Sequence, residues 1–580
     1  MSGLGMLLNT AKSAIAAHQI GMNVTGNNIA NVNNPTYSRR TALYSSKMPV
    51  QIGRFIFGTG VDIQQIRRSC NQLIENRLSG QKSSLSANAE MSAYMNILET
   101  SFNENSEAGL STQMSGFWNL WQDLSNNPAG SSERSGLYEK GVLLSDQFDS
   151  LDADLTQIKV DINKDIEAAA HKINSLTSDI AAINGEIVAL ETGGNANDLR
   201  DRRNALVAEL SEIIDIQTFE QTNGEISVST GNGYLLVNHT DAYSLKISEG
   251  RVEYLSSNGG SIDITDGIDG GKIGGLFNMR DEVVPKYQAE LNELAKQFIW
   301  SVNLQHSKGI GLEYFSSSVT GTYSVSDPDT ALNSAGPPVN LSYGDNIESG
   351  NFTLWIQNDS TSAKTAVNIN IDPDTITLNE FAAAIDAASG ISAFVNGDSE
   401  LVLNADDGFS FSFSDDTGIA AALGINTFFE GDDAETIRVN SLLKNTDYIA
   451  AAKLDENGEF AAGDNSNALS IADLQYQTQN ISQWTFERGG GADSTNLSIS
   501  FEDFYHSMLG SMGIKSANIS SSVEFNEVMA AKLGEQRDAV SAVSLDEEMV
   551  NMMKYQHAFT AASRLLNVAD EMLNTLIELR

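Results

Sequence analysis

The chain has 580 residues, enough for about three or four domains of ordinary size. Its formal net charge of −41 argues against nucleic acid or an anionic membrane surface as a partner, because like charges would repel each other. A single cysteine, Cys70, excludes a disulfide within the chain.

The N-terminal segment is predicted to form a helix over residues 4–32. Apolar side chains recur every seven residues on it, which is typical of a helix that packs lengthwise against another helix. These are Leu8, Ile15, Met22 and Ile29. The helix should end before Pro35, because the residue preceding a proline avoids the α-helical conformation. Residues 36–66 then read as extended, with strand-like runs at 41–44 and 54–57.

Helical periodicity returns over residues 67–104 and 109–125, and the longest predicted helix covers residues 137–192. Two apolar stripes run along that helix, one strictly at heptad spacing and the other with a shift of one residue between Ile158 and Ile166. One stripe is Phe148, Leu155, Ile162, Ala169, Leu176, Ile183 and Leu190, and its companion is Leu144, Leu151, Ile158, Ile166, Ile173, Ile180 and Ile187. At 1.5 Å per residue this helix would be about 80 Å long, so it indicates a rod-like element. A second helix, 198–214, is expected to fold back along it.

The middle of the chain changes character twice. Residues 216–275 alternate with period two, which predicts a β-hairpin or meander, and residues 276–306 are again helical. The block 311–437 is rich in Gly, Ser, Asp and Asn, and Lys364 is its only basic residue. Its short predicted strands, such as 352–356, 367–371 and 409–413, surround one helix near 378–389. We therefore interpret it as an inserted β-rich domain with an acidic, solvated exterior.

The C-terminal part, about 515–579, is helical almost throughout and repeats the heptad pattern of the N-terminus. Its stripe is Leu545, Met552, Phe559, Leu566 and Leu573. We therefore predict a mainly α fold with β-rich insertions: a terminal coiled-coil helix pair, a long helical rod domain and an inserted β-rich outer domain. The N- and C-terminal segments should share domains, because the chain leaves a terminal coil and returns to it.

Three domains follow from these boundaries. The predicted terminal coiled-coil domain combines residues 1–66 and 530–580. The helical rod domain combines 67–310 and 438–529, and the outer domain is 311–437.

Motifs for catalysis and metal binding are missing from the sequence. The six histidines are scattered without metal-ligand spacing, and the glycine-rich run after Arg488 lacks the Gly-Lys-Ser/Thr ending of a phosphate-binding loop. We expect no catalytic residue, no cofactor and no metal site, and we do not expect an enzyme.

The segment Asn27–Arg40, Asn-Asn-Ile-Ala-Asn-Val-Asn-Asn-Pro-Thr-Tyr-Ser-Arg-Arg, resembles the N-terminal signature of the bacterial flagellar rod, hook and hook-associated proteins. The residues that carry the signature turn are Asn27, Asn28, Asn31, Pro35, Tyr37 and Arg39. Thr36 stands where the family usually has glycine, which favours a type I turn over type II, because type II requires a positive φ there. The segment 543–566 is similar to the family's C-terminal helix.

Within this family, the resemblance covers nearly the whole chain for the hook-associated proteins that form the first junction between hook and filament. The runs Asn197–Leu206 and Asn465–Leu474 also look like those proteins. The resemblance implies a structural subunit of the hook–filament junction, with the terminal helices as its assembly interface. Copies of the chain would form a ring or short helical layer, with the hook protein below and hook-associated protein 3 above.

The resemblance also implies a location and a route. The protein would be extracellular, in the flagellum, and exported through the flagellar type III pathway without a cleaved signal peptide. A cytoplasmic export chaperone would hold the C-terminal helix beforehand.

Alternatives remain open at this point. The chain could be another axial or coiled-coil extracellular structural protein, such as a hook or rod-like subunit or an adhesin stalk. A wall-degrading hydrolase fused to an axial protein is a third class, and only block 311–437 has room for it.

Overall fold

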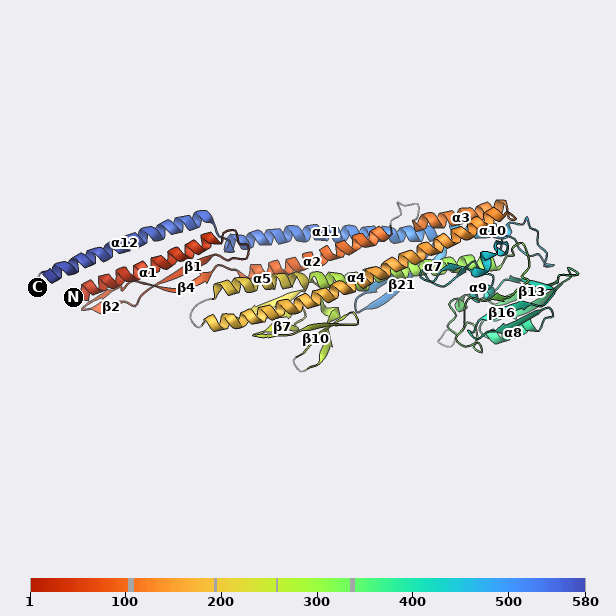
Figure 1. Ribbon diagram of the computed structural model, residues 1–580, viewed down its shortest axis with the longest axis horizontal. Coiled ribbons are helices and arrows are strands. Elements are labelled where there is room, and N and C mark those ends of the chain that lie inside the picture. Colours follow the sequence, from red (N-terminus) through yellow and green to blue (C-terminus); the bar gives the residue numbers. More distant parts are fainter. Residues whose placement is uncertain (1, 103–108, 192–195, 257–258, 334–338, 579–580) are drawn as a thin grey trace. The chain divides into compact units, whose positions relative to one another are not determined.

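A computed structural model describes residues 2–102, 109–191, 196–256, 259–333 and 339–578 (Figure 1). It divides into two compact units. Unit 1 comprises Met1–Ala93, Ile162–Met279 and Ala517–Arg580, and unit 2 comprises Tyr94–Asp161 and Arg280–Ser516. The N- and C-terminal segments therefore belong to the same unit, as predicted. Within the described ranges, every helix is too short or too polar to span a bilayer.

The terminal part of unit 1 pairs two long helices over a small sheet. Its elements are α1 (Ser2–Ala30), β1 (Arg40–Ser46), β2 (Val50–Ile52), β3 (Phe55–Phe57), β4 (Val61–Arg68) and α12 (Leu545–Glu578). α1 lies beside α12 on one side and contacts β1 and β4 (Figure 1). β1 pairs antiparallel with β4, from Arg40 opposite Arg68 to Ser46 opposite Val61. β2 and β3 form a separate hairpin between them.

The remainder of unit 1 packs helices against two small antiparallel sheets. The helices are α2 (Gln72–Ser101), α4 (Ser131–Glu191), α5 (Asn197–Ile213), α6 (Gly271–Asn278) and α11 (Phe501–Ser541), of which α2, α4 and α11 contribute residues to both units. One sheet has the order β5-β6-β7-β8: Ile216–Glu220, Ile226–Thr230, Leu235–Asn238 and Asp241–Ala242. The other has the order β11-β10-β9: Ser261–Asp263, Arg251–Leu255 and Leu245–Ser248.

Unit 2 has an aromatic core between helices. Its helices are α3 (Leu110–Asn126), α7 (Val284–Ser307), α8 (Leu378–Asp386), α9 (Ile419–Ala422) and α10 (Ser466–Ala472), and a π-helical turn, Met279–Val283, precedes α7. Six apolar residues of α3 are buried: Leu110, Met114, Phe117, Trp118, Trp121 and Leu124. They pack on α7 through ring contacts such as Trp118–Phe298, with centroids 5.1 Å apart.

The described strands of unit 2 form two three-stranded sheets and two two-stranded pairings. The larger sheets have the orders β14-β13-β17 and β12-β16-β15. Their strands are β12 (Val319–Thr320), β13 (Gly350–Asn358), β14 (Lys364–Ile371), β15 (Ile391–Val395), β16 (Leu401–Ala405) and β17 (Phe409–Asp415). The others are β18 (Phe429–Glu430) with β19 (Arg438–Val439), and β20 (Gln479–Glu487) with β21 (Gly491–Ile499).

The predicted fold class is confirmed, and the two stripes of α4 are buried at every position except Leu190, which is 60% exposed. Several helix boundaries were wrong. α4 begins at Ser131 rather than 137, because Glu133 lies in its first turn, where a negative charge favours the helix start. α11 begins at Phe501 rather than about 515, because Phe501, Tyr505 and Met508 bury one face there.

Candidate assembly site

The terminal helices meet along a seam in which most of the fully buried side chains are small. The α12 residues that are buried or partly buried in it alternate at spacings of four and three: Glu548, Met552, Tyr555, Phe559, Ala562, Leu566 and Ala569. The buried residues of α1 are Ala11, Ser13, Ala17, Gly21, Val24, Thr25 and Asn28. A Cβ on Gly21 would lie 2.9 Å from the ring of Tyr555, so the two helices approach closely there.

The predicted interface residues mostly line the edges of this seam. Met552, Phe559 and Leu566 are partly buried on α12, while Leu545 and Leu573 remain 46% and 38% exposed. On α1, all four predicted residues are partly buried and none is fully buried: Leu8, Ile15, Met22 and Ile29. The centre of the seam instead holds the smaller side chains between them.

The signature turn closes the C-terminal end of α1. Tyr37 N–H donates to the Asn34 carbonyl over 3.1 Å, which defines a turn with Pro35 and Thr36 at its centre. Thr36 is not among the residues with positive φ, so the turn is not type II, as predicted. Asn31 donates through its Nδ2 to the Asn27 carbonyl over 2.9 Å, which satisfies an acceptor in the last turn of the helix.

Asn28 is the centre of the polar network under this turn. Its Oδ1 accepts from the Tyr37 hydroxyl over 2.7 Å and from Arg40 N–H over 3.1 Å. Its Nδ2 donates to the Arg40 carbonyl and to Glu548 Oε2, both over 2.9 Å. Burial raises the pKa of the Tyr37 hydroxyl, so this group keeps the proton that it donates. Asn28 thereby connects α1, β1 and α12 through one buried amide.

Arg39 connects the turn to the start of α12. Its Nε lies 2.9 Å from Glu548 Oε1, and its Nη1 lies 2.9 Å from Glu547 Oε2. Its backbone N–H donates to the Ser541 carbonyl over 2.8 Å, at the end of α11. Since the Glu548 side chain is only 3% exposed, its charge is balanced by Arg39 and Asn28 rather than by water.

A second ion-pair cluster joins the turn to α5. Asp201 lies 3.0 Å from Arg68 Nη1 and 3.3 Å from Arg40 Nη2, and it also accepts from Ser38 N–H. Arg40 further pairs with Asp198. Burial tends to lower the pKa of Arg40, but these carboxylates outweigh that effect and the net shift is upward. The aspartates belong to the Asn197–Leu206 run that the sequence singled out.

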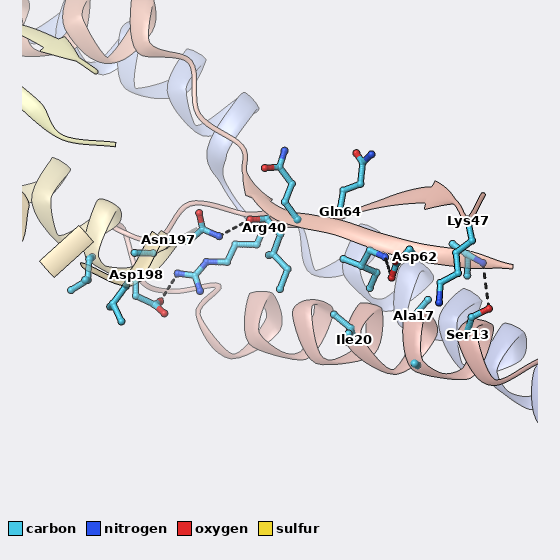
Figure 2. A pocket seen from close by; sticks show the side chains of 17 residues that line it. Ser13, Ala17, Ile20, Arg40, Lys47, Asp62, Gln64, Asn197 and Asp198 are labelled. Carbon is cyan, nitrogen blue, oxygen red and sulfur yellow. Dashed lines mark hydrogen bonds and ion pairs between the residues drawn. The ribbon is translucent and has the colours of Figure 1, made fainter. Parts of the chain in front are cut away.

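A cavity of about 680 Å³ lies beside this cluster, between α1, β4 and the start of α5 (Figure 2). Its polar residues mostly pair with one another: Ser13 Oγ accepts from Val61 N–H, and Asn197 Nδ2 donates to the Ile66 carbonyl. Among the described residues there is no cluster of His, Cys, Asp or Glu that could hold a metal. The groups around the cavity hold secondary-structure elements together and form no arrangement of nucleophile and base.

Glu548, Asp201 and Arg68 were not predicted as site residues from the sequence. A charge asymmetry could have indicated the first of these, because residues 1–61 contain no Asp or Glu while α12 opens with Asp546, Glu547 and Glu548. Glu548 also fits the four-and-three spacing of the α12 seam. Asp201 and Arg68 could not be paired from the sequence, since they lie on separate elements 133 residues apart.

Comparisons with known proteins point to flagellar axial proteins. The model for the flagellar hook-associated protein FlgK helical domain matches residues 95–317. Flagellar basal body rod models match both ends: the FlgEFG C-terminal model over 536–579 and the rod protein model over 8–37. Hook-associated protein 1 of Escherichia coli K12 is 27% identical over 100% of both chains, and that of Bacillus subtilis is 25% identical over 100% of this chain and 98% of its own.

The chain is similar to flagellar hook-associated protein 1 over its whole length. A solved FlgK hook junction protein from Burkholderia pseudomallei shares its fold, with a TM-score of 0.53 over 80% of this chain and 100% of that one, at 16% identity. The predicted resemblance is therefore confirmed. As a hook-associated protein, the chain is a structural component of the flagellum, an external structure, and it assembles with other axial components.

Proposed function

We propose that this hook-associated protein forms the junction between hook and filament, and that α1 and α12 are its assembly interface. The proposal rests on the apolar side chains that are exposed on the outer surface of the helix pair. Large apolar side chains on α12 stay exposed there by 44–64%: Leu545, Met549, Val550, Met553, Leu565, Val568, Met572 and Ile577. A folded monomer has little reason to expose so many apolar groups along one helix, so they indicate a surface for partners.

The predicted interface residues fit this role because they lie between the buried seam and the exposed surface. Phe559 and Leu566 are partly buried, so part of each side chain remains available to a neighbouring subunit. The signature turn would fix the direction of the helix pair through Asn28 and Arg39. Copies of the chain would form a ring or short helical layer, with the hook protein below and hook-associated protein 3 above.

Export is the second part of the proposal. The chain would leave the cytoplasm through the flagellar type III pathway without a cleaved signal peptide, and a cytoplasmic chaperone would cover α12 until then. The exposed apolar groups of α12 support this, because such a surface invites aggregation when it has no partner.

Two substitutions test the interface. Phe559→Asp and Leu566→Asp each place a charge at the edge of the seam, where desolvation would cost several kcal/mol, about 2–7 for an unpaired polar group. In cells that lack the native protein, we expect either variant to be exported and folded but to release filament subunits into the medium. Phe219→Asp is the control, because Phe219 is 70% exposed on β5, outside the terminal helix pair. Normal motility with either seam variant would contradict the proposed interface.

A truncation separates the axial role from that of an adhesin stalk. Removing residues 1–35 deletes α1 and half of the signature turn while leaving most of the chain intact. A stalk should still be displayed after this deletion, whereas an axial subunit should no longer be incorporated into flagella. The amount of truncated protein in purified flagella distinguishes the two.

A further inference from the structure

The β2–β3 hairpin presents an apolar face to solvent. Val50 pairs with Phe57 and Ile52 with Phe55, so these four side chains lie on the same face of the ribbon. Phe55 is 71% exposed, Val50 48% and Phe57 42%, and the two phenylalanine rings lie 6.3 Å apart. We call residues 48–57 the apolar hairpin. A two-stranded hairpin with an uncovered apolar face is marginally stable in water, so a partner is expected to cover it.

The apolar hairpin is held at its base and is positively charged. Lys47 N–H donates to the Gly60 carbonyl over 3.0 Å, and the Thr59 hydroxyl donates to the Met48 carbonyl over 2.7 Å. Arg54 is its one charged residue, Lys47 directly precedes the hairpin, and no Asp or Glu occurs anywhere in residues 1–61. Arg54 is exposed in the turn. The partner should therefore combine apolar surface with negative charge.

The first turns of α12 have that combination. Leu545, Met549, Val550 and Met553 are exposed by 45–53%, and we call them the methionine patch. The same turns carry Asp546 and Glu547, both exposed. Flexible methionine side chains adapt to aromatic partners and make favourable sulfur–ring contacts, so this patch suits Phe55 and Phe57.

The two surfaces lie at opposite ends of the terminal helix pair. The segment after the hairpin is anchored at Ser13 of α1 through Val61 N–H, whereas the start of α12 is anchored at Asn28 through Glu548. Fifteen residues of helix separate these anchors, about 22 Å at 1.5 Å per residue. One copy cannot bring its own two surfaces together, but a second copy can present one to the other.

We propose that the apolar hairpin of one copy docks on the methionine patch of a second copy of this chain. The inference rests on the proposed function, because it supplies the head-to-tail contact of the ring or helical layer. A contact between two different surfaces of identical subunits is heterologous, and repetition of such a contact generates rings or helices rather than isolated pairs. The exposed charges favour this docking, because Arg54 of one copy would lie against Asp546 of the next.

Cross-linking between two differently substituted chains tests the contact directly. In a Cys70→Ser background, one chain carries Arg54→Cys and the other Asp546→Cys, and both are expressed in cells that lack the native protein. In purified flagella, mild oxidation should produce a disulfide-linked dimer only when both chains are present. The matched control replaces Asp546→Cys by Phe219→Cys, a site that is 70% exposed but lies on β5, and should give no dimer.

A second variant measures the importance of the contact. Phe55→Ser combined with Phe57→Ser should lower filament retention by about tenfold or more, because the loss of two covered aromatic rings exceeds one decade in affinity. Phe219→Ser should leave retention unchanged. Both variants alter exposed side chains, so their helical circular dichroism and thermal unfolding should match those of the native chain.

The outcomes separate the two proposals. If the unsubstituted chain cannot retain filaments, the proposed junction role fails. If it retains them while no cross-link forms and the double serine variant behaves like Phe219→Ser, the docking inference is overturned and the junction role stands. A cross-link from Arg54→Cys to a different flagellar protein would also overturn the inference, because the occupant would then not be a second copy.

Discussion

The aromatic core of unit 2 and the terminal seam of unit 1 are packed in opposite ways: the core buries large side chains, and the centre of the seam buries small ones. In unit 2, Phe117, Trp118 and Trp121 are at most 1% exposed, and Phe298 and Phe428 pack against them with ring centroids 5.1–5.6 Å apart. The terminal seam instead buries small side chains at its centre, chiefly Gly21, Ala562 and Ala569. The large apolar residues of α12 remain at its edges or outside.

The difference shows how one chain divides its apolar surface between folding and assembly. A fully buried aromatic side chain contributes about 1.5–3 kcal/mol through burial, with a further contribution from ring geometry. An alanine contributes much less, so the terminal pair depends more on its polar contacts. Asn28, Glu548 and Arg39 fix the register of that pair, in the way that a buried polar residue specifies alignment in a coiled coil.

The largest effect is expected from opening the aromatic core. Phe428→Ala removes a ring that contacts Phe117, Trp121 and His306, and it should lower the free energy of unfolding of unit 2 by about 3–5 kcal/mol. Phe394→Ala is the control, because Phe394 is 48% exposed on β15 and should cost less than about 1 kcal/mol. Urea unfolding followed by tryptophan fluorescence measures both. Equal effects would mean that the core is not the stabilising region.

A buried carboxyl is expected to make the stability of unit 2 depend on pH. Glu290 on α7 is fully buried, and its Oε1 lies 3.9 Å from Lys286 Nζ, too far for a hydrogen bond. Burial raises the pKa of Glu290 to about 7, against the opposing effect of Lys286. The folded state therefore binds the proton more tightly than the unfolded state. The contribution of protonated Glu290 to the free energy of unfolding is fully present below about pH 4.5 and is lost as pH rises through 7.

Glu290→Gln tests this by removing the charge while keeping the shape. The variant should match the native chain near pH 4 and be more stable at pH 8 by about 3 kcal/mol at most. Glu293→Gln, three residues along the same helix and partly exposed, should leave the pH profile unchanged. A Glu290→Gln profile that still declines between pH 5 and 7 would assign the effect to another group.

A smaller effect is expected where the signature turn meets α5. Asp201→Asn removes the charge that Arg68 and Arg40 share, and should cost about 1.5–3 kcal/mol, the usual contribution of hydrogen bonds to charged groups. Asp198→Asn removes a partner of Arg40 whose side chain is 85% exposed, and should cost less than about 1 kcal/mol. Thermal unfolding of both variants at low and high salt checks the order, and a larger loss from Asp198→Asn would contradict it.

Long periodic segments were the part of this fold that the sequence predicted best. The stripes of α4 repeat over more than six heptads, so errors at single positions such as Leu190 do not hide the pattern. The strands at 352–356, 367–371 and 409–413 were also predicted correctly, as parts of β13, β14 and β17. Local periodicity was sufficient for these elements because each buries one regular face.

Contacts between distant segments could not be predicted from the sequence pattern. Phe428 and Phe429 fall in the block interpreted as an inserted outer domain, yet Asn303 of α7 accepts hydrogen bonds from both of their backbone N–H groups. The heptad stripes of the terminal helices indicated that the helices pair, but the seam is centred on alanine and glycine. Small residues carry little weight in a hydrophobic pattern, although they decide how closely two helices approach.

The closeness of that approach gives the smallest and most specific prediction. A Cβ on Gly21 would lie 2.5 Å from the Tyr44 hydroxyl and 2.9 Å from the Tyr555 ring, whereas a Cβ on Gly26 would lie 3.9 Å from Met552. Both glycines are inside α1, where alanine is favoured over glycine by about 1 kcal/mol. Gly26→Ala should therefore stabilise the helix pair by up to that amount.

Gly21→Ala has the same helical gain, but it must displace two aromatic side chains, which typically costs about 1–3 kcal/mol. Its net effect should be a loss, measurable as faster amide hydrogen exchange in α1 and α12. Gly26→Ala should slow exchange in the same two helices, so the pair of variants should move the readout in opposite directions. If both variants slow exchange, Tyr44 and Tyr555 move aside without a free-energy cost. The two helices would then pack less closely than the small residues of the seam indicate.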